Sequence, residues 1–281
     1  MLHVLYRKSI AVANSTKIFF WSFCFLRPLE WMRFWFTFPK ELIVQLDNLH
    51  VVLRTKTPHQ KIVDLYMAAS CILSHQYTHG DFGIRKKDTV IDIGAHIGSF
   101  SIFAARDAQG GKVYSFEPDP ANFAQLTKNI NANRAVNVTA SQRAVYATSG
   151  EAYLSQNILN SAERSLYQKG GKRVRVPTTT LLDIFSEYNI ATCNLLKLDC
   201  EGAEYDILFG APRELFGRIE KIVMECHTPS YFNIENPKYT PENMLAHLNQ
   251  CGFETNIIYE NRIHGLIFAK RKSRVKKTEN K

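Results

Sequence analysis

Long apolar runs are missing from this chain of 281 residues. A helix that spans a bilayer needs about 20 consecutive apolar residues. The most apolar stretch, residues 18–26, has only nine between Lys17 and Arg27. No small-residue cleavage site follows it, which argues against a secretory signal peptide. We therefore expect a cytoplasmic protein without a transmembrane segment.

Disulfide and metal patterns are missing as well. The six cysteines form no C-x-x-C pair and no metal-like spacing with histidine. Some fall in or beside apolar, strand-like runs, where cysteine behaves as a small hydrophobic residue. The pattern predicts a reducing compartment, no structural disulfide and no required metal ion.

The body of the chain lacks a net positive charge. Residues 1–40 hold six Lys and Arg against one acid, and residues 270–281 hold seven against one. These two ends account for the formal charge of +9 and leave the remainder close to neutral. The distribution does not favour a nucleic-acid partner, and it predicts a solvated, disordered tail at 271–281.

Aromatic residues are concentrated near the amino end. Residues 18–38 contain ten of them, including all three tryptophans. Pro28 is expected to divide this segment into two short helices. Two hypotheses remain open here. The segment is either a helical cap packed on the domain, or an aromatic, basic helix in peripheral contact with the inner face of a membrane.

The order of the predicted elements indicates an α/β fold. Residues 41–57 predict a hairpin, and residues 59–75 have helical spacing. From Thr89 onward, strands and helices alternate, with 136–145 as one strand and an inserted hairpin or loop at 150–180. Such βα repeats predict a mostly parallel sheet covered by helices on both faces.

The two final strand-like runs, 253–260 and 264–271, are too closely connected to be parallel to each other. We therefore expect a parallel sheet whose last strand is reversed. The predicted organisation is an amino-terminal segment with a hairpin at 1–58, the main domain at 59–270 and the tail at 271–281.

A glycine turn, "VIDIGAHIGSF" (90–100), follows the first strand of the βα series. Gly94 and Gly98 allow the backbone to approach a ligand, and Glu117 ends the next strand, where a carboxylate can accept both hydroxyls of a ribose. The spacing D-x-G-x-x-x-G is neither the dinucleotide pattern G-x-G-x-x-G nor the P-loop pattern. It fits an adenosyl cofactor without a pyrophosphate better than NAD.

Three stretches together resemble the FkbM family of S-adenosylmethionine-dependent methyltransferases: "VIDIGAHIGSFS", "VYSFEPDPANFAQLTKNI" and "LLKLDCEGAEYDIL". The resemblance covers roughly residues 80–270. It implies a Rossmann-like, seven-stranded class I methyltransferase fold, S-adenosyl-L-methionine as cofactor, and O-methylation of a hydroxyl on a sugar, a glycolipid or a secondary metabolite. Residues 1–60 fall outside it.

The resemblance also implies which residues contact the cofactor. Gly94, Ala95, His96 and Gly98 would surround its methionine part, and Asp92 would orient the turn or hold the amino group. The remaining contacts would be Glu117 on the ribose, Pro118 beside the adenine, and Arg143 and Ala144 near the adenine ring. Pro118 and Ala144 are equally consistent with plain packing. His96 is a departure, because the family more often has asparagine there.

Catalytic candidates follow the fourth and fifth strands of the series. An alcohol that attacks a sulfonium methyl group benefits from a general base close to its proton. Asp199 is the first candidate, Glu201 lies two residues later, and His227 is the alternative base at the next strand end. Glu204 is expected to have a structural role at the start of a helix.

Two other functions are consistent with the same pattern. One is a non-catalytic adenosyl-binding or membrane-recruited protein, since a fold does not guarantee an activity. The other, weaker option is an NAD-dependent oxidoreductase.

Overall fold

The computed structural model describes residues 22–24, 26–37, 39, 41–156, 164–165, 172–227, 236–259 and 264–272. Within these ranges no helix is long and apolar enough to cross a bilayer. The predicted disordered tail lies outside the described residues from 273 onward. Arg271 is not part of a tail, because it is the last residue of strand β13 (His264–Arg271).

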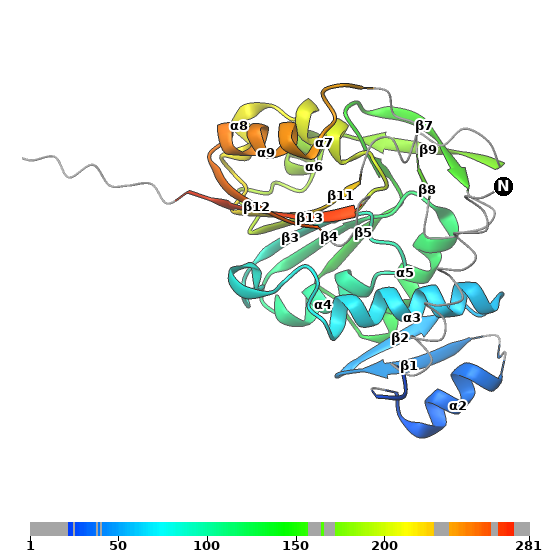
Figure 1. The fold of residues 1–281 in the computed structure, drawn as a ribbon. Coiled ribbons are helices and arrows are strands. Elements are labelled where there is room, and N and C mark those ends of the chain that lie inside the picture. Colours follow the sequence, from blue (N-terminus) through cyan, green and yellow to red (C-terminus); the bar gives the residue numbers. More distant parts are fainter. Residues whose placement is uncertain are drawn as a thin grey trace, which may run out of the picture.

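The predicted hairpin is confirmed as β1 (Leu42–Leu46) and β2 (Leu49–Leu53). It lies between α2 (Pro28–Phe36) on one side and the layer of α3 to α5 on the other (Figure 1). α3 (Pro58–Ile72) begins at Thr57, whose side chain accepts a hydrogen bond from the amide of Gln60. A short 3₁₀ helix, Gly80–Phe82, follows α3.

The main sheet has seven strands in the order β12-β13-β11-β10-β3-β4-β5. β13 is antiparallel to both of its neighbours, and the other described pairings are parallel, as predicted. This is the class I S-adenosylmethionine-dependent methyltransferase fold. The strands are β3 (Thr89–Ile93), β4 (Lys112–Phe116), β5 (Val138–Ser141), β10 (Leu195–Leu198), β11 (Lys221–His227) and β12 (Phe253–Tyr259).

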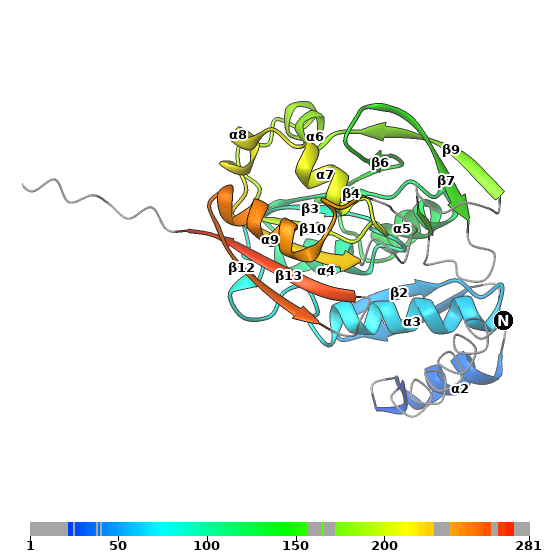
Figure 2. The ribbon, with the colours of Figure 1, turned by 45° about the horizontal axis from the view of Figure 1, so that its top comes forward.

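Helices cover both faces of the sheet (Figures 1 and 2). One face is covered by α3, α4 (Ser99–Asp107) and α5 (Pro120–Ala132). The other is covered by α6 (Leu181–Glu187), α7 (Glu204–Gly210), α8 (Arg213–Phe216) and α9 (Pro241–Gln250). Because strand side chains alternate between faces, Val90 and Leu195 join one core cluster and Ile91 and Leu196 join the other.

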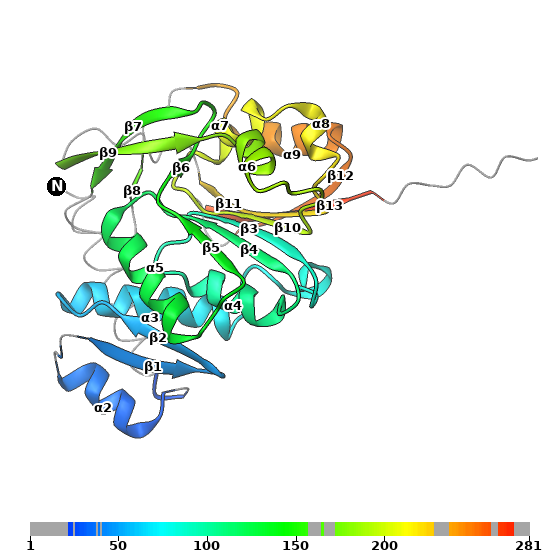
Figure 3. The same ribbon diagram turned by 180° about the vertical axis from the view of Figure 1, so that it is seen from behind.

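The insertion at 150–180 forms a hairpin, as one of the two predictions had it. β7 (Gly150–Gln156) pairs antiparallel with β9 (Lys172–Thr179), and both belong to a second sheet with the order β6-β9-β7-β8 (Figure 3). The prediction of a single strand over 136–145 is wrong. The chain leaves the main sheet after Ser141, and Ala144–Val145 pair with β9 as the edge strand β6, while β8 (Arg164–Ser165) is the strand at the opposite edge.

The amino-terminal hairpin of β1 and β2, called the hairpin below, shares its core with the main domain. Val44, Val51 and Leu53 are buried in the same cluster as Leu65 of α3 and Phe103 of α4. Its edge strand β2 is bonded by α5, since Gln125 and Asn129 donate to the carbonyl of Val52 and Asn129 Oδ1 accepts from the Val52 amide. The predicted domain boundary at residue 58 thus falls within one continuous core.

Candidate active site

The glycine turn connects β3 to α4 in close contact with the neighbouring elements. A Cβ on Gly94 would lie 1.8 Å from the carbonyl oxygen of Asp199, and one on Gly98 would lie 2.5 Å from Cδ1 of Leu126. Both glycines have a positive φ, 75° and 88°. His96 between them also has a positive φ, 53°, which is uncommon for a side chain of this kind. Only glycine fits at 94 and 98, which allows β10 and α5 to approach the turn.

Glu117 lies directly beside this turn. Its Oε2 accepts from the amide of His96 (2.8 Å), and its Oε1 accepts from the amide of Asp119 (2.9 Å) and from Nδ2 of Asn122 (3.3 Å). A carboxylate has about four acceptor positions, and three N–H donors fix its plane here. Pro118 is half-buried, and Asp119 caps α5 through the amides of Ala121 and Asn122.

Asp92 and Lys197 form a buried ion pair beneath the turn. They are register partners on β3 and β10, and their Oδ1 and Nζ atoms lie 3.1 Å apart. Ser101 donates to Asp92 Oδ2 (2.6 Å), and Lys197 donates to the carbonyl of Gly94 (2.8 Å). Of the two roles considered for Asp92, these contacts favour orientation of the turn.

Asp199 is half-buried and follows the last residue of β10. Its Oδ2 accepts from the hydroxyl of Tyr77 (3.1 Å) and lies 3.8 Å from Lys197 Nζ. Burial alone would lower the pKa of Lys197, but Asp92 and Asp199 outweigh that effect and raise the pKa above its usual value. Burial, and then the charge of Asp199, raise the pKa of Tyr77. A protonated lysine and a neutral phenol therefore face the Asp199 carboxylate.

The loop after Asp199 is shaped by Glu204. Its two oxygens accept from the amides of Cys200 (2.9 Å) and Gly202 (2.8 Å), which confirms the expected structural role. Glu201 is half-buried, with a φ of 56°. Burial raises the pKa of Cys200, so its thiol stays protonated at neutral pH.

The other predicted residues are spread around this edge of the sheet. His227 is the last residue of β11, but its side chain lies outside the described part of the structure. Arg143 extends towards α6 and binds Glu187 through two hydrogen bonds of 2.8 and 2.9 Å. Ala144 packs with Leu154 and Val176 in the second sheet, as its packing interpretation has it.

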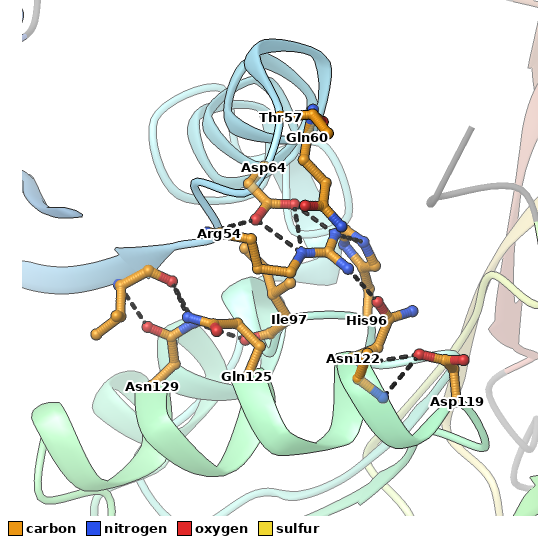
Figure 4. Close-up of polar contacts among 12 residues, drawn as sticks. Arg54, Thr57, Gln60, Asp64, His96, Ile97, Asp119, Asn122, Gln125 and Asn129 are labelled. Atoms are coloured by element: carbon orange, nitrogen blue, oxygen red, sulfur yellow. Dashed lines mark hydrogen bonds and ion pairs between the residues drawn. The ribbon is translucent and has the colours of Figure 1, made fainter. Parts of the chain in front are cut away.

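Sequence reasoning missed Arg54, Asp64, Tyr77 and Asn122. Arg54 follows β2 and reaches His96 in the turn, where its Nη2 lies 2.9 Å from the ring Nε2 (Figure 4). Asp64 of α3 binds the guanidinium (Figure 4), and Asn122 of α5 bonds both Arg54 and Glu117. No local pattern marks these residues, because each comes from a different element.

The model of the methyltransferase FkbM domain matches residues 92–255, more than half of the chain. The chain belongs to the FkbM methyltransferase family. It is therefore an S-adenosylmethionine-dependent methyltransferase, and the alternative of an NAD-dependent oxidoreductase is wrong. The match leaves out α2, the β1–β2 hairpin, α3 and β13.

Relatives of this FkbM-family chain include two curated methyltransferases. It is 29% identical over 175 residues to the 31-O-demethyl-FK506 methyltransferase FkbM of Streptomyces tacrolimicus, covering 51% of this chain and 67% of that one. It is 27% identical over 173 residues to the methyltransferase sdnD of Sordaria araneosa, covering 50% and 67%. The matches thus span about two thirds of these relatives' own length.

Solved structures with a similar fold are more distant. The precorrin-6y C5,15-methyltransferase of Geobacter metallireducens is 12% identical with a TM-score of 0.44, covering 71% of this chain and 86% of that one. TYW2 of M. jannaschii, solved with AdoMet, is 13% identical with a TM-score of 0.42, covering 83% and 88%.

The residues at the turn fit S-adenosylmethionine in the chemistry of their donors and acceptors. The Glu117 carboxylate is held at a strand end by N–H donors, which suits the two hydroxyls of a ribose. The first turn of α4, directly after Gly98, presents amides that have no carbonyl partner within the helix. Among the described residues, no group of three or more His, Cys, Asp or Glu side chains is placed to bind a metal ion.

Proposed function

We propose that this methyltransferase transfers a methyl group to a hydroxyl of a sugar, a glycolipid or a secondary metabolite. The observation that carries the proposal is the position of Asp199. Asp199 directly follows β10, and its backbone carbonyl lies so close to Gly94 of the glycine turn that a Cβ there would be 1.8 Å from the oxygen. S-adenosylmethionine supplies the electrophilic methyl carbon. The acceptor oxygen forms the new C–O bond as the C–S bond breaks, and the hydroxyl proton passes to Asp199.

Tyr77 and Lys197 support this role for Asp199. Lys197 Nζ lies 3.8 Å from Asp199 Oδ2 and the Tyr77 hydroxyl donates to the same oxygen, so both hold the carboxylate in place at the edge of the sheet. An ionised carboxylate at this edge can accept the hydrogen bond of an acceptor hydroxyl and orient its lone pair towards the methyl carbon. Alignment of two reactants is worth up to about 7–11 kcal/mol of the barrier. His227 remains the alternative base, and Glu201 would contribute a further acceptor in the same loop.

The acceptor class is inferred from chemistry and from one relative. The relative from Streptomyces tacrolimicus is named as the methyltransferase of 31-O-demethyl-FK506. That name indicates that the methyl group is added to the oxygen at position 31. A carboxylate next to the methyl donor suits a neutral hydroxyl, because a hydroxyl donates to the carboxylate and loses its proton there.

The test is transfer of a labelled methyl group from S-adenosylmethionine into a fractionated lysate, followed by mild alkali. A methyl ether survives this treatment, whereas a methyl ester is hydrolysed and releases methanol. We expect alkali-stable label with the wild-type protein and much less with Asp199→Asn. Label released as methanol, or label found on nitrogen, would contradict O-methylation of a hydroxyl.

We also infer that α2 is a peripheral membrane contact. Phe34 is buried against the domain, while Leu29, Met32 and Phe36 are 70%, 47% and 69% exposed on the opposite face. Arg33 lies between them on that face and is exposed, as is Arg27 before the helix. An apolar stripe with flanking arginines suits an anionic lipid surface. In this proposal the two predicted roles are combined, with one face of α2 as a cap on the domain and the other in contact with lipid.

A further inference from the structure

A closed ring of hydrogen bonds connects the hairpin to the glycine turn. Arg54 Nη2 bonds the ring of His96 (2.9 Å), and the His96 amide donates to Glu117 Oε2 (2.8 Å). On the other side, Arg54 Nη1 donates to Asn122 Oδ1, and Asn122 Nδ2 donates to Glu117 Oε1 (3.3 Å). Both oxygens of Glu117 are therefore connected to one guanidinium, each through a single intermediate residue.

The donors and acceptors in this cycle of hydrogen bonds allow only one arrangement. A guanidinium has donors and no acceptor, so the Nε2 atom of His96 must accept. The ring proton is then on Nδ1 and the imidazole is neutral. Asn122 must likewise present its oxygen to Arg54 and its NH₂ group to the Glu117 carboxylate. Arg54 thus determines the orientation of the His96 imidazole, and Arg54 and Glu117 together determine that of the Asn122 amide.

Asp64 holds the guanidinium in place. Its Oδ1 accepts from Arg54 Nη2 (2.5 Å), and its Oδ2 accepts from Arg54 Nε (3.0 Å) and from the Arg54 amide (2.9 Å). Arg54 and Asp64 are both buried. An arginine–carboxylate pair with two parallel bonds has a defined geometry as well as charge attraction. Arg54 consequently has little freedom to move away from His96.

The backbone at His96 requires this kind of support. A positive φ is unfavourable for a residue other than glycine and persists only where its surroundings impose it. His96 has a φ of 53°, and its amide is the donor to Glu117. A second contact from the hairpin side fixes the next residue, because Asn129 bonds both the Val52 amide (2.6 Å) and the carbonyl of Ile97 (2.8 Å).

We propose that Arg54 is a positioning residue for cofactor binding, which acts through His96 and Asn122 on the Glu117 carboxylate. The amino-terminal hairpin then contributes to the cofactor site although it lies outside the FkbM match at 92–255. The proposal rests on Glu117 as the ribose ligand, which is part of the proposed function. It does not depend on the acceptor or on the identity of the base.

The test compares Arg54→Met with Arg106→Met. Arg106 of α4 also binds the β1–β2 hairpin, through Asp47 (2.6 Å) and Asn48, and its other ion pair is with Asp107 of its own helix, not with the turn. We expect Arg54→Met to weaken S-adenosylhomocysteine binding in calorimetry by about tenfold, the lower end of what a lost supporting contact costs at a ligand site. Arg106→Met should leave the affinity within about twofold, as expected of a surface contact distant from the ligand. Equal losses in the two variants would overturn the proposal.

Two further measurements keep the test decisive if Arg54→Met folds poorly. Asn122→Leu leaves the Arg54–Asp64 pair intact and should weaken S-adenosylhomocysteine binding with an unchanged melting temperature of the ligand-free protein. In nitrogen-15 spectra of labelled histidine, His96 should show a protonated Nδ1 and an unprotonated Nε2, with the signal assigned by its loss in His96→Asn. Arg54→Met should remove this tautomer preference.

The two hypotheses fail in different ways. If Glu117→Ala binds S-adenosylhomocysteine as the wild type does, the role of Glu117 is wrong. If Glu117→Ala loses binding but Arg54→Met and Asn122→Leu both retain it, only the role of Arg54 is wrong.

Discussion

Lys197 Nζ lies 3.1 Å from Asp92 Oδ1, across neighbouring parallel strands and beneath the turn that includes Gly94. Both side chains are buried. The pair therefore joins β10 to β3 directly below the glycine turn. Lys197 also contacts Asp199 and the Gly94 carbonyl, so one ammonium group connects the catalytic candidate, the turn and the strand beneath it.

Loss of one partner of this pair should destabilise the protein. Lys197→Met leaves Asp92 as an unpaired buried charge, which typically costs about 3–5 kcal/mol. Asp92→Asn combined with Lys197→Met should cost less than the single lysine variant, because no buried charge remains. Urea unfolding measures the free energy of unfolding of each variant. Lys128→Met is the control, since its pair with Glu41 is exposed and should change stability by less than about 1 kcal/mol. If the losses of stability in Lys197→Met and in Asp92→Asn alone add up to the loss in the double variant, the pair is not coupled.

Glu117→Ala should weaken the binding of S-adenosylhomocysteine by more than about tenfold. Hydrogen bonds to a charged group are worth about 1.5–3 kcal/mol, or ten- to a hundredfold in affinity. Calorimetry measures the change. Glu151→Ala is the matched control, because its carboxylate is exposed and pairs with Arg175 in the second sheet. An unchanged affinity in Glu117→Ala would remove Glu117 from the cofactor site.

Asp199→Asn should lower turnover by about 10²–10⁴, the usual cost of losing a general base. The amide keeps the shape of the side chain, so the affinity for S-adenosylhomocysteine should change little. Initial rates of methyl transfer, measured beside calorimetry, separate the two effects. If Asp199→Asn keeps its turnover and His227→Gln loses it, the base is His227. Full activity in both variants would mean that alignment alone drives the reaction.

The exposed face of α2 should bind vesicles that contain anionic lipid. Met32→Glu combined with Phe36→Glu replaces two exposed apolar side chains by carboxylates and leaves the buried Phe34 in place. Near an anionic surface each basic residue gains about 1 kcal/mol, and added acids should reverse that gain. We expect co-sedimentation to fall by about tenfold, which corresponds to about 1.4 kcal/mol.

Val136→Glu is the control for this experiment, because Val136 is 96% exposed and belongs to no part of α2. It should sediment with vesicles as the wild type does. A wild-type protein that stays in the supernatant would make α2 a cap of the domain only.

The sequence was sufficient to predict a mostly parallel sheet with a reversed last strand, and the glycine turn. Alternation of apolar strands with helices, the short link before residues 264–271 and the glycines at 94 and 98 are local signals, and local signals survive in a linear chain. Ligands bind at the carboxyl ends of parallel strands. This rule predicted the edge of the sheet at which Glu117 and Asp199 lie.

Only the tertiary structure decided which side chains support that site. Arg54, Asp64 and Asn122 come from β2, α3 and α5 and meet because the hairpin packs on these helices, which no spacing within the chain encodes. The same holds for the departure of the chain from the main sheet after Ser141, where pairing of Ala144 with β9 replaced continuation of β5. Long-range hydrogen bonds and shared burial choose between conformations that are locally equivalent, and these interactions exist only once the fold has formed.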